Sequence, residues 1–146
     1  MRPVHLSNID TRMPVFLLSN VCHRLNKTDE ISVLFSQCAP SIVCLTETWL
    51  TPDIPDSVVD MQGYEILRKD RLSGLGGGVA VYISNDCQFH RFSSLECNLF
   101  EVLWLLVRPK QLPRPLSSLV VAAVYCPPCY NADQKKNFVQ TYHRFM

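Results

Sequence analysis

The sequence has 146 residues, of which 47% are hydrophobic and 18% charged, and its 14 basic and 13 acidic residues give a net charge of +1. This length fits one domain, and the apolar content excludes a disordered polar chain, which buries too little apolar surface to offset its chain entropy. The balanced charge excludes a nucleic-acid binder that works through bulk charge. Any contact with phosphate must therefore come from a local site.

The N-terminal third predicts a strand, a helix and a second strand. Residues 1–13 show no periodicity and are expected to form a loose leader before a domain over 14–146. The apolar run 14–19 predicts a buried strand, and Pro14 is tolerated at its start. In 28–38 the apolar residues recur with helical spacing, and a second buried strand follows at 41–46. This order is typical of a βαβ unit.

The helix over 28–38 has the signals of a helix start. Thr28 is the expected cap, and Asp29 and Glu30 lie where the helix dipole favours acids.

The rest of the sequence predicts four further strands and a second helix. Asn131, with Gln134 three residues later, has the pattern of a capping box at the start of that helix. Loops are expected at 51–60 and at the glycine-rich stretch 70–78. The strands are expected at 64–68, 79–83, 100–107 and 119–125, and the helix at 131–146.

Three polar side chains follow or end predicted strands. Glu47 comes directly after the strand 41–46, where open α/β sheets place their ligands, and a carboxylate held there suits Mg²⁺. A solvated loop acid is the equal alternative. Asn20 ends the first strand. It becomes a stronger candidate if the two strands are neighbours, because Asn20 and Glu47 would then reach the same edge of the sheet. Tyr125 ends the last strand, where its phenol can reach a phosphate oxygen or simply lie at the rim of the sheet.

Two further features have a structural and a functional reading. The glycines of Gly74–Gly78 precede a strand and not a helix, so they favour a tight turn over a phosphate cradle. Arg68, Lys69 and Arg71 flank them and offer a weak contact for a nucleic-acid backbone, although a solvated basic loop is the more common case.

The cysteines and the hydropathy bear on the compartment. Seven cysteines are an odd number, which disfavours a disulfide framework, and Cys126–Cys129 has no second pair to complete a metal site. No apolar run approaches about 18 residues, the length of a membrane span, and Asp10 and Arg12 interrupt any secretory signal. We expect a nuclear or cytoplasmic protein with reduced thiols, neither secreted nor in a membrane.

Several short motifs in order resemble a known family. They are Asn20–Lys27, Ile42–Leu50 with Leu-Thr-Glu-Thr-Trp-Leu, Tyr64–Arg71 with Arg-Lys-Asp-Arg, Gly76–Tyr82 and Val124–Pro128. Together they resemble the N-terminal part of the endonuclease/exonuclease/phosphatase (DNase I-like) domain, in the version carried by non-LTR (LINE-type) retrotransposon polyproteins, whose endonuclease accompanies a reverse transcriptase.

The resemblance implies a fold and a site. The fold is an α/β class, four-layer α/β/β/α sandwich with a mixed β-sheet and flanking helices, of which this chain would form the N-terminal half with the second sheet largely missing. The family cleaves phosphodiester bonds with Mg²⁺ or Mn²⁺, and its retrotransposon members nick target DNA. By position, Asn20 and Glu47 resemble metal-site residues, and Tyr125 resembles the tyrosine that approaches the phosphate.

The sequence also departs from the family pattern. It contains no Gly-Asp, Ser-Asp or Asp-His pair, so the general-base Asp and the C-terminal Asp-His have no counterpart. We therefore expect a fragment of a metal-dependent endonuclease with low metal affinity and weak or no activity, and an uncovered sheet face that allows self-association. The alternatives are a non-catalytic protein- or nucleic-acid-binding module, and a phosphoinositide or phospholipid phosphoesterase relative.

Overall fold

The computed structural model describes residues 13–143. In this part of the chain, strands and helices alternate in the first third, and strands dominate the rest. The elements are β1 (Phe16–Asn20), η1 (Arg24–Lys27), α1 (Thr28–Cys38), β2 (Ile42–Thr46), η2 (Asp56–Val58), β3 (Tyr64–Lys69), β4 (Val79–Ser84), β5 (Gln88–Arg91), η3 (Ser93–Leu95), β6 (Glu101–Arg108), β7 (Leu119–Tyr125) and α2 (Ala132–Tyr142).

The strands form two sheets. The first has the order β1-β2-β4-β3, with β1 parallel to β2 and the other pairs antiparallel. The second has the order β5-β6-β7 and is antiparallel throughout. The first sheet is mixed because β1, α1 and β2 form the predicted βαβ unit, and its crossover helix returns the chain to run parallel.

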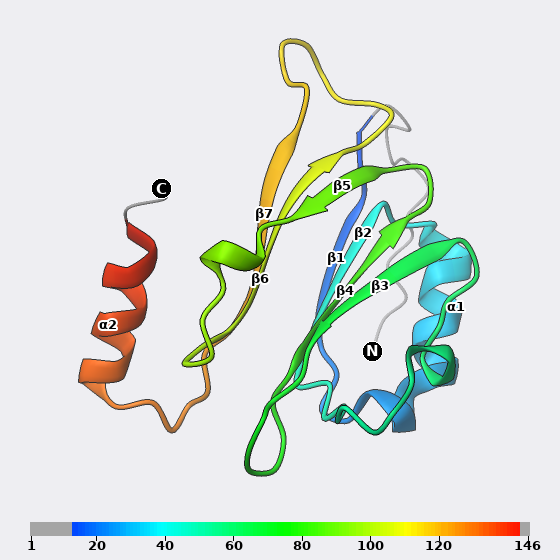
Figure 1. Cartoon of the computed structure of the whole chain (residues 1–146). Helices are drawn as coiled ribbons and strands as arrows, with labels where there is room; N and C mark the ends of the chain where they lie inside the picture. The colour runs from blue at the N-terminus through cyan, green and yellow to red at the C-terminus, as the bar shows by residue number, and fades with distance from the viewer. Residues whose placement is uncertain (1–12, 144–146) are drawn as a thin grey trace, which may run out of the picture.

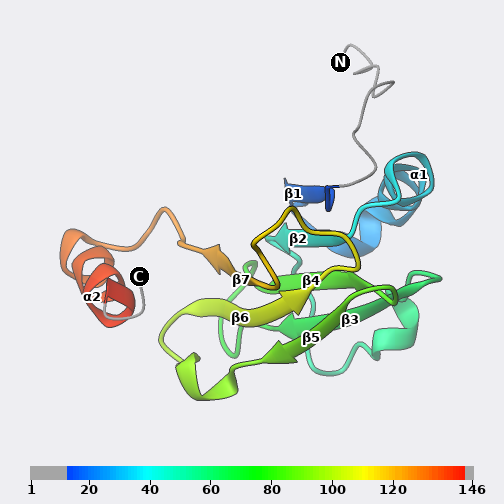
Figure 2. The ribbon, with the colours of Figure 1, turned by 90° about the horizontal axis from the view of Figure 1, so that it is seen from above.

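The molecule has four layers (Figures 1 and 2). Helix α1 covers the outer face of the first sheet, where Ile31 and Phe35 pack on Val43 and Tyr82. Helix α2 lies on the outer face of the second sheet, where Tyr142 packs in the cluster of Trp104. The predicted α/β/β/α sandwich with a mixed sheet and flanking helices is confirmed.

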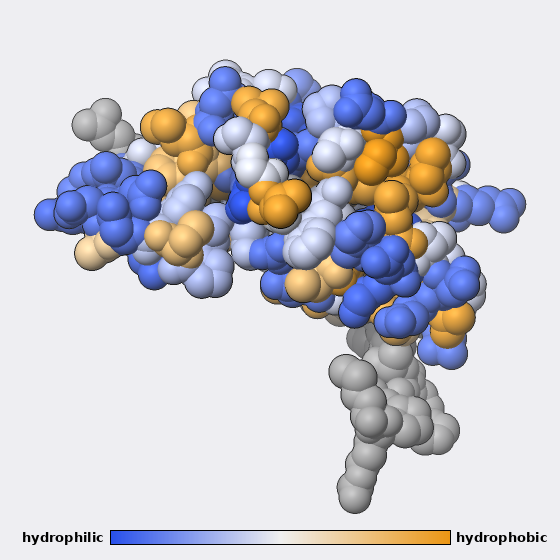
Figure 3. Space-filling view, turned by 90° about the horizontal axis from the view of Figure 1, so that it is seen from below, coloured by the Kyte–Doolittle hydropathy of each residue, from blue (hydrophilic) through white to orange (hydrophobic). Residues whose placement is uncertain are grey.

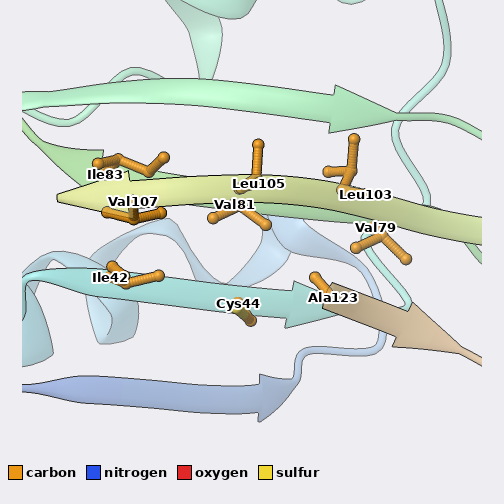
Figure 4. Packing of buried hydrophobic residues seen from close by; sticks show 9 residues of the cluster. All are labelled: Ile42, Cys44, Val79, Val81, Ile83, Leu103, Leu105, Val107 and Ala123. Atoms are coloured by element: carbon orange, nitrogen blue, oxygen red, sulfur yellow. The ribbon is translucent and has the colours of Figure 1, made fainter. Parts of the chain in front are cut away.

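The main core lies between the two sheets (Figure 4). Each strand that faces this core contributes every second residue, as the two-residue period of a strand requires. The buried members are Ile42, Cys44, Val79, Val81, Ile83, Leu103, Leu105, Val107 and Ala123.

The second sheet corrects one expectation. It was expected to be largely missing, but three of its strands are present and cover most of the inner face of the first sheet. Strand β5, at Gln88–Arg91, was not predicted, because its four residues combine polar side chains with a half-buried Phe89 and give no clear alternation of burial-prone residues. Strands β6 and β7 lie within one residue of their predicted positions.

Of the capping residues predicted for the two helices, those of α2 are confirmed and that of α1 is wrong. Asn131 and Gln134 form the predicted capping box of α2. Thr28 does not cap α1. Its hydroxyl instead donates to the carbonyl of Leu25, because the preceding η1 turn leads directly into the helix. The leader was predicted over 1–13, and residues 1–12 lie outside the described part. Within 13–143, no helix has the length and apolar character needed to cross a membrane.

Candidate active site

The carboxyl ends of three strands meet at one edge of the sandwich. Asn20 and Thr46 are Cα partners at the ends of β1 and β2, so Asn20 and Glu47 lie at adjoining strand ends. The backbone N–H of His23 donates to the carbonyl of Glu47 over 2.9 Å and fixes the two turns against each other. The structure thus places Asn20 and Glu47 at adjoining strand ends on one edge of the first sheet.

Tyr125 reaches the same edge from the second sheet. It pairs with Glu101 at the start of β6, and Glu101 accepts a hydrogen bond of 2.6 Å from the N–H of Gly78. Gly78 precedes Val79, the Cα partner of Thr46. The Tyr125 ring packs partly against the core. Among the described residues, no hydrogen bond joins its hydroxyl to Asn20 or Glu47.

The Glu47 carboxylate is held in place by two donors. Trp49 donates to its Oε2 from the indole Nε1 over 2.7 Å, and Gly77 donates to the same oxygen from its backbone N–H over 3.2 Å. The backbone N–H of Trp49 in turn donates to the carbonyl of Gly77. Within residues 13–143, Oε1 accepts no hydrogen bond, and it is therefore the oxygen left for a ligand.

Backbone strain is concentrated at this edge. Outside glycine, residues 13–143 contain five positive φ angles, and four of them follow β1 or β2: Cys22 (47°), His23 (88°), Glu47 (57°) and Trp49 (56°). The fifth, Ala39, ends α1. Positive φ in a residue with a side chain costs about 1–2 kcal/mol and is found disproportionately at functional sites.

Two buried polar atoms beside Glu47 add to this strain. Within the described chain, Thr48 Oγ1 and His23 Nδ1 are buried without a hydrogen-bond partner. The His23 ring lies 5.4 Å from the Trp49 ring, centroid to centroid. Buried polar groups without partners are rare in folded proteins, so both mark this edge as one where stability is not the only constraint.

The glycine-rich connection positions Glu47, which sequence reasoning missed. Gly76, Gly77 and Gly78 all have positive φ, as the predicted tight turn requires. A Cβ at Gly78 would meet the buried Thr48 Oγ1 at 2.5 Å, so the turn packs closely on the segment after β2. In β6, Glu101 alternates onto the same inner face as Leu103 and Leu105. A charged residue at such a position is the sequence signal that could have linked this turn to the second sheet.

The three basic residues near this turn are already paired. Arg68 forms ion pairs with Asp56 and Asp70, and its other donors reach backbone carbonyls. Lys69 donates to the carbonyl of Cys97 over 2.6 Å, and Arg71 forms a 2.5 Å ion pair with Glu101. Their contact with nucleic acid stays a prediction, and it would require these cations to exchange partners.

A pocket of about 740 Å³ opens beside the Arg71–Glu101 pair, but not over Glu47. Its charged lining is balanced, because Lys69, Arg71 and Arg91 pair with Glu96 or Glu101. The glycine-rich connection beside Glu47 exposes the apolar side chains of Leu72 and Leu75. Seen from below, hydrophobic residues lie among hydrophilic ones on the molecular surface (Figure 3). Asn20, Glu47 and Tyr125 do not line this pocket.

Comparison with solved structures identifies the architecture. The AP endonuclease LMAP of Leishmania major superposes with a TM-score of 0.69 over 99% of this chain, at 18% sequence identity. The chain has the endonuclease/exonuclease/phosphatase fold. The endonuclease domain of TRAS1, a telomere-specific non-LTR retrotransposon, shares this fold over 92% of the chain with a TM-score of 0.65 and 12% identity.

The match to this fold covers only part of each neighbour. The chain spans 51% of the Leishmania protein and 54% of the TRAS1 domain, so it corresponds to about half of an endonuclease/exonuclease/phosphatase fold. The 3′ phosphatase NExo of Neisseria, solved with a product DNA hairpin, matches 89% of the chain and is itself covered to 49%, with 17% identity and a TM-score of 0.56. Neither a protein-family model nor a curated protein sequence matches the chain.

Proposed function

We propose that this chain forms part of a divalent-metal-dependent phosphodiesterase site that acts on DNA. Glu47 holds the ion, Asn20 orients its surroundings, and Tyr125 contacts the phosphate. The observation that carries the proposal is the Glu47 carboxylate, fixed through one oxygen at a strained strand end while the other oxygen stays open. Strain combined with a preorganised carboxylate is typical of a binding site.

The donor set fits one side of a Mg²⁺ or Mn²⁺ site. Glu47 offers a carboxylate oxygen and Asn20, which is exposed, offers an amide oxygen, and Mg²⁺ prefers such oxygen ligands together with waters and substrate phosphates. Residues 13–143 contain no group of three His, Cys, Asp or Glu side chains that could hold a metal. The expected affinity of the chain alone is therefore low.

Each side chain has a distinct task in the proposed site. Trp49 and Gly77 hold Glu47 Oε2, so Oε1 is presented without reorganisation. Tyr125 can donate a hydrogen bond from its phenolic O–H to a phosphate oxygen at the same edge. A bound divalent ion supplies charge neutralisation at the phosphate. The sequence lacks the family's general-base Asp, so proton transfer from water is weakly assisted, and we expect slow hydrolysis at best.

The solved neighbours support DNA as the substrate class. Two of those described above are endonucleases by name, and the third was solved with a DNA product. A broader phosphoesterase role would preserve the same Glu47 chemistry but would not require a nucleic acid.

Metal binding at Glu47 is tested with Tb³⁺, a hard cation that emits when a nearby indole transfers energy to it. Trp49 Nε1 lies 2.7 Å from Glu47 Oε2, so excitation of Trp49 should sensitise Tb³⁺ bound there. We expect emission that Mg²⁺ competes away and that Glu47→Gln abolishes. Glu65→Gln, an exposed residue of β3 at the opposite end of the sheet, is the matched control. Emission that survives in Glu47→Gln would rule out this metal site.

Activity is tested by nicking of supercoiled plasmid with Mg²⁺ or Mn²⁺. We expect nicking that is slow or absent, and any signal should be lost in Glu47→Ala and reduced in Tyr125→Phe, which removes the phenolic donor without disturbing the ring. Robust nicking that depends on Glu47 would overturn the expectation of weak activity. Nicking that is unchanged in Glu47→Ala would place the chemistry elsewhere.

A further inference from the structure

The connection between β3 and β4 carries two leucines that lie almost entirely in solvent. Leu72 is 76% exposed and Leu75 is 94% exposed, the highest value for a large hydrophobic side chain among residues 13–143. Figure 1 shows this connection projecting below the two sheets. It leads from β3, the outer strand on the side of the first sheet away from β1. The two leucines are therefore presented at a projecting tip of the molecule.

The loop beneath these leucines is held in one conformation. The guanidinium of Arg71 donates to the carbonyl of Leu75 over 3.0 Å and forms an ion pair with Glu101. It also packs against Gly77, where a Cβ would collide with the Arg71 guanidinium. The leucines are thus exposed on a loop that is fixed from within, and their direction is preorganised.

The tip of this loop adjoins the candidate active site. Gly76, the residue after Leu75, lies against Glu47, because a Cβ on Gly76 would come within 3.4 Å of Glu47 Oε2. Gly77, the next residue, donates to the same oxygen. Consecutive Cα atoms are about 3.8 Å apart, so a nucleic-acid strand that reaches Glu47 also passes beside Leu75.

The tip has no charge with which to bind phosphate. Residues 72–78 read Leu-Ser-Gly-Leu-Gly-Gly-Gly, and both Arg68 and Arg71 at the base of the loop form ion pairs with carboxylates of this chain. Binding to the phosphate backbone depends on cations that neutralise it. Leucine is instead a side chain that DNA-bending proteins insert between base steps.

We infer that Leu75, flanked by Leu72, is an apolar wedge that enters duplex DNA beside the strand held at Glu47. The inference rests on the proposed function and deepens it by naming the substrate, a duplex with a base step that unstacks at low cost. Insertion of a wedge disrupts base stacking, and this cost is least at a mismatched or unpaired base. The loop therefore selects DNA by its deformability and not by charge.

The test is binding of a short fluorescent duplex to the full chain, by anisotropy without divalent metal, so that no strand is cut. A duplex with one central mismatch should bind about tenfold more tightly than the matched duplex. Leu75→Ser should weaken binding of the mismatched duplex by about tenfold, because the burial of a leucine side chain is lost. Its circular dichroism spectrum should not change, since Leu75 is exposed.

The matched control is an exposed leucine at the other end of the sandwich. Leu116 is 53% exposed and lies in the connection between β6 and β7, whereas Glu101 and Tyr125 lie at the opposite ends of these strands. Leu116→Ser should bind both duplexes as the natural chain does.

Insertion itself is measured with 2-aminopurine, a base whose fluorescence rises when it leaves the stack. Placed beside the mismatch, it should brighten with the natural chain and with Leu116→Ser, and stay dim with Leu75→Ser. Salt gives a second measurement. Few phosphate contacts predict an affinity that falls by about tenfold or less between about 50 and 200 mM salt, whereas 6–10 contacts would cost about 10³–10⁵.

Several results would overturn the inference. They are an absence of DNA binding, equal affinity for the two duplexes, an affinity that Leu75→Ser leaves unchanged, a dim 2-aminopurine, and a loss of about a thousandfold over that salt range. Binding to phosphatidylcholine vesicles that depends on Leu75, without binding to DNA, would assign the loop to a lipid surface instead.

The proposed function is judged by a different measurement, the Tb³⁺ emission that depends on Glu47. Leu75→Ser should retain this emission, because Trp49 and Gly77 hold the Glu47 carboxylate. Emission that persists while the DNA measurements fail would reject the wedge alone. Loss of the Glu47 dependence would reject the metal site whatever the DNA measurements give.

Discussion

Trp49 donates a hydrogen bond of 2.7 Å from its indole Nε1 to Oε2 of Glu47, two residues earlier in the chain. Both residues have positive φ, and this conformation turns both side chains to the same side of the segment after β2. The indole is 39% exposed and is therefore not held by burial alone. The strain of the backbone and the hydrogen bond together fix the direction of a single carboxylate.

Removal of the indole donor should weaken metal binding without unfolding the chain. Trp49→Phe retains an aromatic ring beside His23 but leaves Glu47 Oε2 with only the Gly77 donor. Residues that orient a metal ligand typically change affinity by about tenfold or more, so we expect the Mn²⁺ dissociation constant to rise by about tenfold. Electron paramagnetic resonance of free Mn²⁺ measures it. An unchanged affinity would show that the indole does not orient Glu47.

The glycine turn should tolerate a side chain at one position and not at another. Gly74 and Gly78 have nearly equal φ, +82° and +85°, so alanine carries the same backbone strain at both. A Cβ at Gly74 meets nothing within 4 Å, whereas at Gly78 it meets the buried Thr48 Oγ1. We expect Gly74→Ala to cost about 1 kcal/mol and Gly78→Ala about 2 kcal/mol more, in urea unfolding. Equal costs would contradict the close packing.

Stability should fall at alkaline pH because of a buried thiol. Burial raises the pKa of Cys44 from 9.0 to about 11. Below pH 9 the thiol is protonated in both the folded and the unfolded chain. Between pH 9 and 11 only the unfolded chain releases the proton, so the free energy of unfolding falls, by on the order of 2–3 kcal/mol over the whole range.

The Cys44 contribution is isolated by comparing variants. Cys44→Ala should lose less stability between pH 8.5 and 10.5 than the natural chain, in urea unfolding at each pH, since the cost of the smaller side chain is the same at every pH. Cys126→Ala, which replaces an exposed thiol, should follow the natural chain. Burial also raises the pKa of Tyr64 and Tyr82, so a residual alkaline loss is expected in both variants.

The capping box should contribute to the stability of helix α2 against local unfolding. Asn131 accepts from the N–H of Gln134, and the Gln134 side chain accepts from the N–H of Asn131. Asn131→Ala removes the cap at a cost of about 1 kcal/mol, which corresponds to roughly fivefold faster amide exchange in α2. Asn137→Ala, within the helix, should slow exchange slightly, because alanine is the better helix former. Faster exchange in both variants would point to packing, not capping.

Much of the fold follows from local patterns. The helical spacing of Ile31 and Phe35 places α1, and runs of apolar residues place most strands to within two residues. Strand β5 was not predicted, because the extended conformation of its four residues depends on pairing with β6 and not on a hydrophobic pattern of their own. The sheet assignment of β6 and β7 depends on contacts far apart in the sequence, which no local period encodes.

The candidate site was predictable only in part. Glu47 and Asn20 could be located because strand ends follow directly from apolar runs. The groups that hold the Glu47 carboxylate could not be located, because the hydrogen bond from Gly77 to Glu47 joins residues 30 positions apart in the sequence. The ion pairs of Arg68 and Arg71 were likewise invisible in the sequence, where a basic loop looks the same whether it is free or paired.

Glu101 connects the two sheets at the site. One of its oxygens accepts from Arg71 and the other from the N–H of Gly78, both on the connection between β3 and β4, while Glu101 itself begins β6. Gly77, which holds Glu47, lies between these two anchors in the same turn. If one sheet slid over the other, Gly77 would move and the Glu47 carboxylate would be reoriented. The resistance of the two sheets to sliding therefore determines how precisely this carboxylate is positioned.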